Sequence, residues 1–233
     1  MGNKAAKEFK ALELGTGHLD ADGPSCISSK LVFHEKNSFQ STIKKQDIYW
    51  SYGDSSKVAF TNKTPSLKAL NTQIITDAEG KLLAVIKKKS DLKIEVISFY
   101  CPTPCFDKQE ATPEIREDPE GKDMPMYLKS IIERVGTFKV EVAAYMVTGV
   151  DESGEVTKKL SYTAEQIDSL QFMALVKAAD GTPVGKLVMT GKLGGFAVET
   201  APKVDVPIVI ILACSVRTGG TVIAPIMVAQ GLI

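Results

Sequence analysis

A compact apolar run near the C-terminus constrains this chain more than any other stretch. It extends from Val204 to Val216 (VDVPIVIILACSV). Asp205 has the side chain of a helix N-cap, and Pro207 falls in the first turn, where a missing N–H matters least. Arg217 and two glycines follow the run, as is typical of a helix C-terminus. We therefore expect a central helix over residues 205–217 that is apolar on every face and must be enclosed by lipid or by protein.

The rest of the chain has the size and composition to supply that enclosure. With 233 residues, 44% of them hydrophobic, it can form one large domain with a sizeable core. The 28 basic and 28 acidic residues cancel, which argues against nucleic acid as a partner and leaves only local attraction to a membrane. The four cysteines do not make a disulfide framework, and the polar N-terminus has no apolar signal segment, so we expect a cytoplasmic protein.

Most of the chain before the helix has the texture of short strands bounded by Asn, Asp, Gly, Ser or Pro. Two hairpins are clearest, because an acidic residue opens each turn and a glycine, Gly80 or Gly181, can take a positive φ near its end. A dozen or so short strands in an open sheet would expose edges, which favours a closed barrel filled by the apolar helix. The predicted strands are Ser29–His34, Phe39–Ile43, Asp47–Tyr52, Lys57–Thr61, Leu67–Leu70, Thr72–Thr76, Leu82–Lys88, Leu92–Tyr100, Met126–Glu133, Thr137–Thr148, Val156–Tyr162, Gln171–Lys177, Val184–Thr190 and Gly195–Thr200.

Several segments depart from this strand texture. Residues 1–25 contain scattered glycines with little periodicity, which predicts a flexible N-terminal leader. Residues 101–123 contain four prolines and many charges, which predicts an insert or linker within a barrel domain spanning residues 26–217. Residues 218–233 form an apolar C-terminal extension. The capping-box spacing in TAEQID predicts one helical turn over Thr163–Asp168.

Two hairpin motifs and one longer terminal motif give the chain a resemblance to a known family. They are DAEGKLL (Asp77–Leu83) with Lys87–Lys89 behind it, DGTPV (Asp180–Val184), and FAVETAPKVD (Phe196–Asp205), which runs into Val206–Val216. In this order they resemble the LURP-one-related proteins of the tubby C-terminal-like superfamily, to which phospholipid scramblases are more distantly similar.

The resemblance implies a mainly β fold without characteristic catalytic residues. It would be a closed, antiparallel, twelve-stranded tubby-like β-barrel that encloses a hydrophobic C-terminal α-helix. The structural residues of that core helix would be Asp205, Val206, Ile208, Val209, Ile210, Ile211, Leu212 and Val216.

Signatures of catalytic and metal-binding chemistry are absent from the sequence. HExxH, GxSxG and GxGxxG do not occur. His18 and His34 are the only histidines, and neither has neighbours that would make it a base. Cys101 and Cys105 lack the second close pair that tetrahedral zinc needs, so we expect plain loop cysteines, with a metal site or a regulatory disulfide as the alternative. We predict no catalytic residue, no metal and no cofactor.

The densest basic cluster follows the first hairpin turn and consists of Lys87, Lys88, Lys89 and Lys93. In a strand, Lys87 and Lys89 point the same way, so that with Lys93 they would form a small positive face near a barrel rim. Such a face suits a phosphoinositide headgroup, since each lysine contributes on the order of 1 kcal/mol near an anionic surface. The alternative is that these lysines protect a sheet edge or solvate a strand end.

Together these features predict a non-enzymatic binding protein. We expect it to bind phosphoinositide or another anionic membrane lipid, or a protein partner, as a cytoplasmic monomer that is peripheral at membranes. Two other classes stay open: a scramblase-like membrane protein with an inserted C-terminal segment that acts on phospholipids, and an enzyme whose site is assembled from distant residues. Gly2, after the initiator Met, is the position that N-myristoylation modifies, although Ala6 stands where that motif has Ser or Thr. The alternative is a polar leader without acylation.

Overall fold

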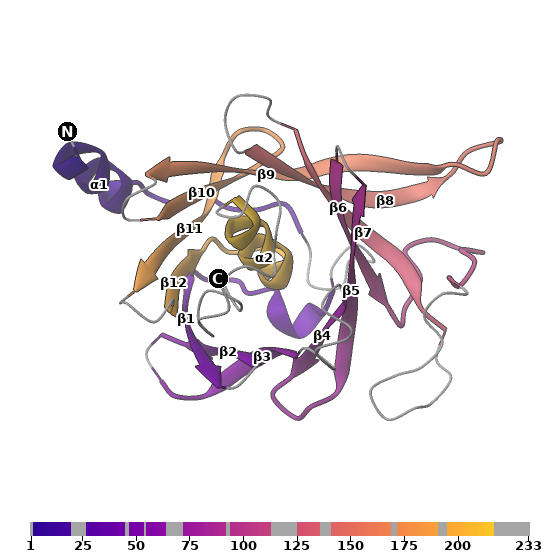
Figure 1. The fold of residues 1–233 in the computed structure, drawn as a ribbon, viewed down its shortest axis with the longest axis horizontal. Coiled ribbons are helices and arrows are strands. Elements are labelled where there is room, and N and C mark those ends of the chain that lie inside the picture. Colours follow the sequence, from indigo (N-terminus) through magenta and orange to yellow (C-terminus); the bar gives the residue numbers. More distant parts are fainter. Residues whose placement is uncertain are drawn as a thin grey trace.

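The computed structural model describes residues 2–19, 27–44, 47–53, 55–63, 72–91, 94–112, 125–135, 141–168, 172–190 and 195–216. Within these residues the dominant element is a closed barrel of twelve strands (Figure 1). The strands are β1 (Asn37–Lys44), β2 (Asp47–Tyr52), β3 (Val58–Lys63), β4 (Thr72–Asp77), β5 (Leu82–Asp91), β6 (Ile94–Cys101), β7 (Tyr127–Arg134), β8 (Glu141–Val150), β9 (Val156–Asp168), β10 (Met173–Ala178), β11 (Pro183–Thr190) and β12 (Gly195–Thr200).

The barrel is an up-and-down meander. Each strand pairs antiparallel with its neighbours in the sequence, and β1 closes the barrel by pairing with β12, with Phe39 opposite Val198. Closure removes the exposed edges that an open sheet of so many short strands would have. The predicted fold class, a closed antiparallel twelve-stranded barrel around a hydrophobic C-terminal helix, is therefore confirmed.

The hairpin turns have the chemistry that their sequences predict. In the β4–β5 turn the Asp77 carboxylate accepts hydrogen bonds from the N–H groups of Glu79 and Lys81, at 3.1 and 2.8 Å. Gly80 then takes φ +85°, and Gly181 takes φ +88° in the β10–β11 turn. These left-handed conformations favour glycine, since a Cβ would make them strained.

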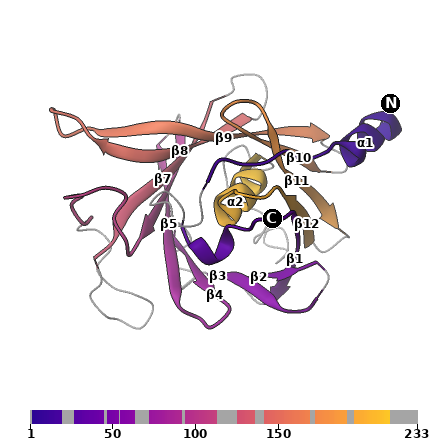
Figure 2. The ribbon, with the colours of Figure 1, turned by 180° about the vertical axis from the view of Figure 1, so that it is seen from behind.

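Helix α2 (Val206–Val216) lies inside the barrel (Figures 1 and 2), and every one of its residues is buried. It packs against the inner faces of strands β8 to β12. Its approach to β11 requires a glycine, because a Cβ on Gly185 would come within 2.6 Å of Cγ1 of Val209. The largest fully buried aromatic side chains are Phe39, Trp50, Phe60, Phe99 and Phe196.

Helix α1 (Gly2–Ala11) lies against the outside of the barrel, where β9 ends and β10 begins (Figure 2). Among its described side chains, Ala6 and Phe9 are buried, and they form a small cluster with Met173 and Leu175 of β10. A helix with one apolar stripe docks on a surface in this way, whereas a helix that is apolar on every face must be enclosed.

The segment after α1 is hydrogen-bonded to the barrel. The N–H groups of Gly15 and Gly17 donate to the carbonyl groups of Pro183 and Pro202, both at 2.8 Å. We predict a flexible leader over residues 1–25 from the lack of periodicity; in the structure, residues 2–19 instead form a helix and a bonded segment. Backbone hydrogen bonds of this kind leave no period in the side chains, so sequence pattern does not reveal them.

The segment predicted as strand Ser29–His34 contains a short 3-10 helix, η1 (Ser29–Leu31), in place of a strand. Leu31 and Val32 are adjacent in the sequence and both are buried. Side chains of consecutive strand residues point to opposite faces, so at a barrel with one solvated face a turn of helix buries this pair more readily.

The predicted helical turn over Thr163–Asp168 is wrong, because these residues continue β9. Ala164 lies opposite Val142 of β8 on one side and Val176 of β10 on the other. Two strand ladders supply more hydrogen bonds than one isolated helical turn, so tertiary pairing overrides the local capping-box spacing.

Some predicted features lie outside the described residues. They are strand Leu67–Leu70, residues 113–123 of the insert, Lys93, Arg217 and the extension 218–233.

Candidate functional site

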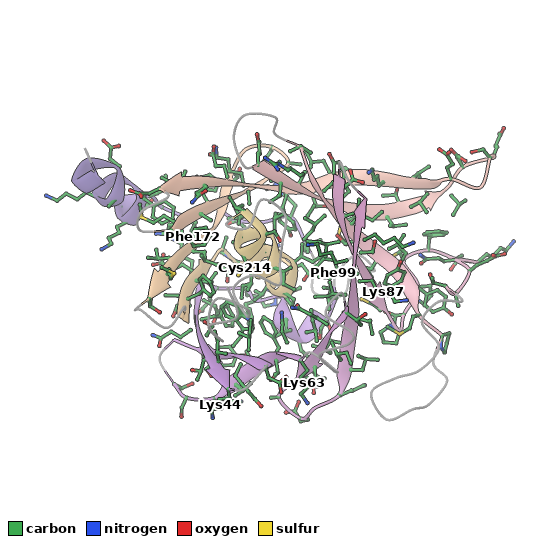
Figure 3. All side chains as sticks on the ribbon, in the orientation of Figure 1. Lys44, Lys63, Lys87, Phe99, Phe172 and Cys214 are labelled. Atoms are coloured by element: carbon green, nitrogen blue, oxygen red, sulfur yellow. The ribbon has the colours of Figure 1, made fainter. Side chains whose placement is uncertain are left out.

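The three described lysines of the basic cluster are divided between the two faces of β5. Lys88 lies opposite Ile97 of β6, a fully buried core residue, so its side chain is on the inner face. Lys87 lies opposite Ser98 and Lys89 opposite Val96, both on the outer face. The structure therefore places Lys87 and Lys89, two of the lysines predicted to bind a headgroup, on the outer face of the barrel (Lys87 is labelled in Figure 3). The side chain of Lys88 is on the inner face.

The outer face beside these lysines also contains an ion pair. Val96 lies between Lys89 of β5 and Glu133 of β7 in one row across the sheet. Glu133 in turn accepts a hydrogen bond of 2.5 Å from Lys158 of β9. The positive charge of Lys158 is therefore matched by a carboxylate on this face.

Asp205 directly precedes α2 and is 1% exposed. Its Oδ1 accepts a hydrogen bond of 3.3 Å from the N–H of Ile208, which confirms the predicted N-cap, and its Oδ2 accepts one of 2.6 Å from the N–H of Ile27. Burial raises the pKa of Asp205 to about 6, against the lowering effects of these two N–H groups and of the Lys129 charge. The carboxyl group thus fixes the start of α2 and holds the Ile27 segment against it.

Sequence reasoning missed two buried lysines. Lys129 of β7 is 2% exposed, and its charge acts on both Asp205 and Cys105. The β6–β7 ladder shifts register between Phe99 and Tyr100, at the level of Lys129, so simple alternation does not place this side chain. Lys186 of β11 is 7% exposed and lies under α1.

The histidines and cysteines that the structure describes differ in their surroundings. His18 is exposed and its Nε2 lies 2.9 Å from Oδ2 of Asp180, whose pKa falls to about 2 because of the Thr182 N–H and this histidine. Burial raises the pKa of the Cys105 thiol, which makes it less reactive. Among the described residues, no group of three or more His, Cys, Asp and Glu side chains is arranged to hold a metal ion.

Within the part of the chain that the structure describes, no helix has both the length and the apolar character needed to cross a bilayer. The eleven residues of α2 are shorter than the roughly 20 that a spanning helix needs.

Comparison with known proteins supports the fold. No protein-family model matches the chain, and no curated protein matches it. The structure is similar to the X-ray structure of an Arabidopsis thaliana protein, AT5G01750, with a TM-score of 0.54 and 12% sequence identity. The match covers 84% of this chain and 98% of that one. At this level of identity the similarity concerns the fold alone, because one fold supports many functions.

Proposed function

We propose that this protein is a non-catalytic, LURP-one-related binding protein of the tubby-like superfamily, and that it binds anionic phospholipid headgroups at the cytoplasmic face of a membrane. The proposal rests on the position of Lys87 and Lys89, whose side chains follow one another on the outer face of β5. The ligand class is a phosphoinositide, whose clustered phosphates match two neighbouring ammonium groups.

The filled interior supports a binding site on the outside. α2 is enclosed on every face, and the barrel lumen that accommodates a ligand in other barrels is occupied here by this helix and by aromatic side chains. A ligand of the folded protein therefore has to bind on the outer surface or at the ends of the barrel.

The spacing of the two lysines supports a phosphate-rich ligand. Residues i and i+2 of a strand lie about 7 Å apart on the same face. Two ammonium groups at this separation can contact two phosphates of one inositol ring, or the phosphates of neighbouring lipids. Since the whole chain has 28 basic and 28 acidic residues, attraction to a membrane has to come from such a local surface.

Vesicle co-sedimentation tests the lipid proposal directly. Wild-type protein and Lys87→Ala/Lys89→Ala are compared on phosphatidylcholine vesicles with and without phosphoinositide. At about 1 kcal/mol for each lysine, the double variant should bind phosphoinositide vesicles roughly thirtyfold more weakly. Vesicles with phosphatidylserine at equal charge, and soluble inositol phosphate as competitor, separate headgroup recognition from general attraction to an anionic surface.

The matched control removes two exposed lysines elsewhere, as Lys36→Ala/Lys57→Ala, with the same change in net charge. Lys88→Ala tests the division between faces, since the inner lysine should contribute less than Lys87 or Lys89. Equal binding by wild type and Lys87→Ala/Lys89→Ala, or equal losses in both double variants, would remove the proposed site.

The enclosed position of α2 favours peripheral binding over insertion. A scramblase-like protein with an inserted C-terminal segment would resist extraction from membranes at alkaline pH, whereas a protein bound through headgroups should be released. Attachment through a myristoyl group on Gly2 would add the mass of that chain to the N-terminal peptide, which mass spectrometry of protein from eukaryotic cells measures.

A further inference from the structure

The β8–β9 hairpin extends past the point where β7 stops pairing with it (Figure 1). β7 pairs with β8 from Arg134, opposite Val142, to Ser130, opposite Met146. β8 continues to Val150 and remains paired there with β9 alone. Along residues 147–150 the β7-facing edge of β8 therefore has no strand partner among the described residues.

A loop has taken the place of β8 along the first residues of β7. The side chain of Gln109 fixes this loop, because its Nε2 donates to the carbonyl of Leu128 and its Oε1 accepts from the N–H of Cys105, both at 2.7 Å. The N–H of Thr112 donates to the carbonyl of Met126 at 2.7 Å. Because the loop is bonded to β7, a gap remains between the loop and the end of β8.

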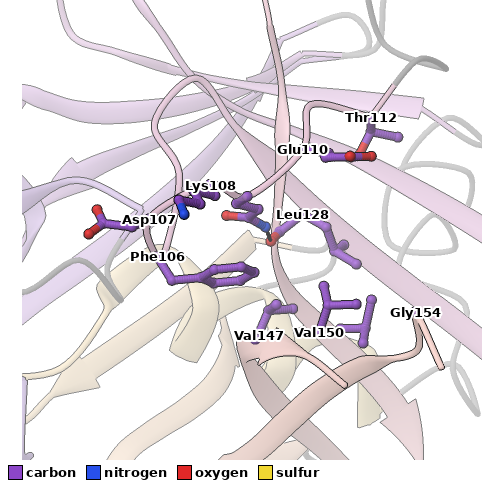
Figure 4. A pocket seen from close by; sticks show the side chains of 12 residues that line it. Phe106, Asp107, Lys108, Glu110, Thr112, Leu128, Val147, Val150 and Gly154 are labelled. Atoms are coloured by element: carbon purple, nitrogen blue, oxygen red, sulfur yellow. Dashed lines mark hydrogen bonds between the residues drawn. The ribbon is translucent and has the colours of Figure 1, made fainter. Parts of the chain in front are cut away.

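This gap forms a groove of about 700 Å³ with apolar walls (Figure 4). Phe106 and Leu128 contribute to one wall, and Val147, Val150 and Val156 to the other. Val150 and Val156 are 51% and 42% exposed and lie directly opposite each other on the hairpin. Single exposed valines are ordinary, but an adjacent pair in a groove is typical of a binding surface.

The backbone of β8 offers hydrogen bonds at this groove. The N–H of Asp151 donates to the carbonyl of Glu155 at 2.9 Å. In an antiparallel ladder, bonded and non-bonded pairs alternate, so the neighbouring Val150–Val156 pair is non-bonded. The N–H and C=O of Val150 then point away from β9, toward the groove, where they have no partner among the described residues.

Acidic side chains surround the groove. Asp107 and Glu110 are exposed on the loop, and Lys108 is the cation between them. The tip of the hairpin adds further exposed carboxylates. Asp107 and Glu110 line the groove, and Glu152 and Glu155 are exposed on the adjacent turn. The Oδ1 of Asp151 is used within that turn, where it accepts hydrogen bonds from Ser153 and from the N–H of Glu155. This excess of negative charge favours a ligand with basic residues.

We propose that the open edge of β8 binds an extended peptide segment of a partner protein, which adds to the sheet as a strand. Backbone hydrogen bonds to Val150 would give affinity, and alternate side chains of the peptide would enter the valine-lined groove. The acidic rim selects a peptide in which Lys or Arg flanks the alternating apolar residues. This site is separate from the lysines of β5, so the inference does not rest on lipid binding.

Selection from a phage-displayed library of random linear peptides on the full chain tests the proposal. We expect enriched sequences with alternating apolar residues and flanking Lys or Arg, and binding of one synthetic peptide from this set by fluorescence anisotropy. Val150→Thr/Val156→Thr keeps β-branched side chains in the strands but removes apolar contact, and should weaken binding about tenfold. Val150→Pro removes the edge N–H, which β9 does not use, and should abolish binding.

The control is Val135→Thr, at the third exposed large apolar side chain among the described residues, which should bind the peptide as wild type does. Thermal unfolding by circular dichroism confirms that each variant keeps the barrel. The proposal is overturned if selection enriches no alternating sequences, or if the selected peptide binds Val150→Thr/Val156→Thr as tightly as Val135→Thr. Concentration-dependent dimerisation that Val150→Pro abolishes would also overturn it, since the occupant would then be a second copy of this chain.

Discussion

Two helices of nearly equal length take opposite positions in this protein. α1 has ten residues and lies outside the barrel, and α2 has eleven and lies inside it. α2 has no charged residue, and all of its side chains are buried. α1 has charged residues, such as Lys7 and Glu8, and buries only Ala6 and Phe9 among the side chains that the structure describes.

The difference between the helices determines which changes the fold tolerates. Each buried aliphatic side chain of α2 adds roughly 1.5–3 kcal/mol, so this helix is a large share of the core that holds the barrel together. α1 contributes only the apolar side chains of one face, which belong to a small cluster on the outer surface of the barrel. We therefore expect changes in α2 to affect the whole domain and changes in α1 to remain local.

The largest effect is expected for Ile210→Asp in α2. Ile210 is fully buried, and a carboxylate at that position would lie in the core without a partner. Loss of the buried isoleucine side chain and burial of a carboxyl group without a partner each cost several kcal/mol, and together they approach the about 5–15 kcal/mol by which domains are stable. The variant should be unfolded or insoluble, as measured by circular dichroism and solubility. A soluble variant with the wild-type β spectrum would show that the barrel does not depend on its helix.

A smaller effect, and one that depends on pH, is expected at Asp205. Its carboxyl group has a pKa of about 6 in the folded protein against 3.8 as the ordinary value. Between these values the folded state binds more protons than the unfolded state, so this group's contribution to stability falls as pH rises. The loss is complete above about pH 6 and is on the order of 2–3 kcal/mol.

Asp205→Asn isolates this pH dependence, because asparagine is also a good N-cap but does not titrate in this range. Urea unfolding is measured for both proteins between pH 4 and pH 7. We expect the stability of the wild type, relative to the variant, to decrease across this window. Parallel curves would mean that burial does not disfavour the ionised carboxylate.

The position of α2 could be predicted from the sequence, whereas that of α1 could not. An all-apolar run with an acidic cap leaves enclosure as the only solution, and the many short strands supply the barrel. Among its described side chains, α1 buries only Ala6 and Phe9, which is too little to separate a docked helix from a polar leader. The backbone N–H groups of Gly15, Gly17 and Leu19 bond this segment to the barrel, and backbone groups of this kind occur in every sequence.

Like the positions of the two helices, the candidate sites could be predicted from the sequence only in part. Strand alternation correctly put Lys87 and Lys89 on one face, because β5 is regular there. The burial of Lys129 depends on a register shift, and the groove beside Val150 depends on where β7 separates from β8. Register between strands far apart in the chain is set by tertiary packing, so a single sequence does not specify these features.

The local character of α1 is tested by Phe9→Ala. Phe9 is 5% exposed and belongs to the cluster that α1 forms with Met173 and Leu175 of β10. Its loss should weaken docking of α1 by about 2–3 kcal/mol, less than a full core position because the helix can separate from the barrel. Hydrogen exchange should speed up in α1 and remain unchanged in α2. Faster exchange throughout the barrel would mean that the two helices belong to one cooperative unit.

The smallest effect is expected at Lys186, which joins α1 to the barrel by polar contacts. Its Nζ donates to the carbonyl groups of Leu12 and Lys10, at 3.1 and 3.4 Å, and lies 2.8 Å from a carboxylate oxygen of Glu199. Lys186→Met keeps the buried aliphatic stem but leaves these carbonyls to water, which should cost about 1 kcal/mol of docking. Hydrogen exchange in residues 6–12 should then rise less than in Phe9→Ala. An equal or larger rise would show that the ammonium group, rather than the apolar stripe, holds the outer helix.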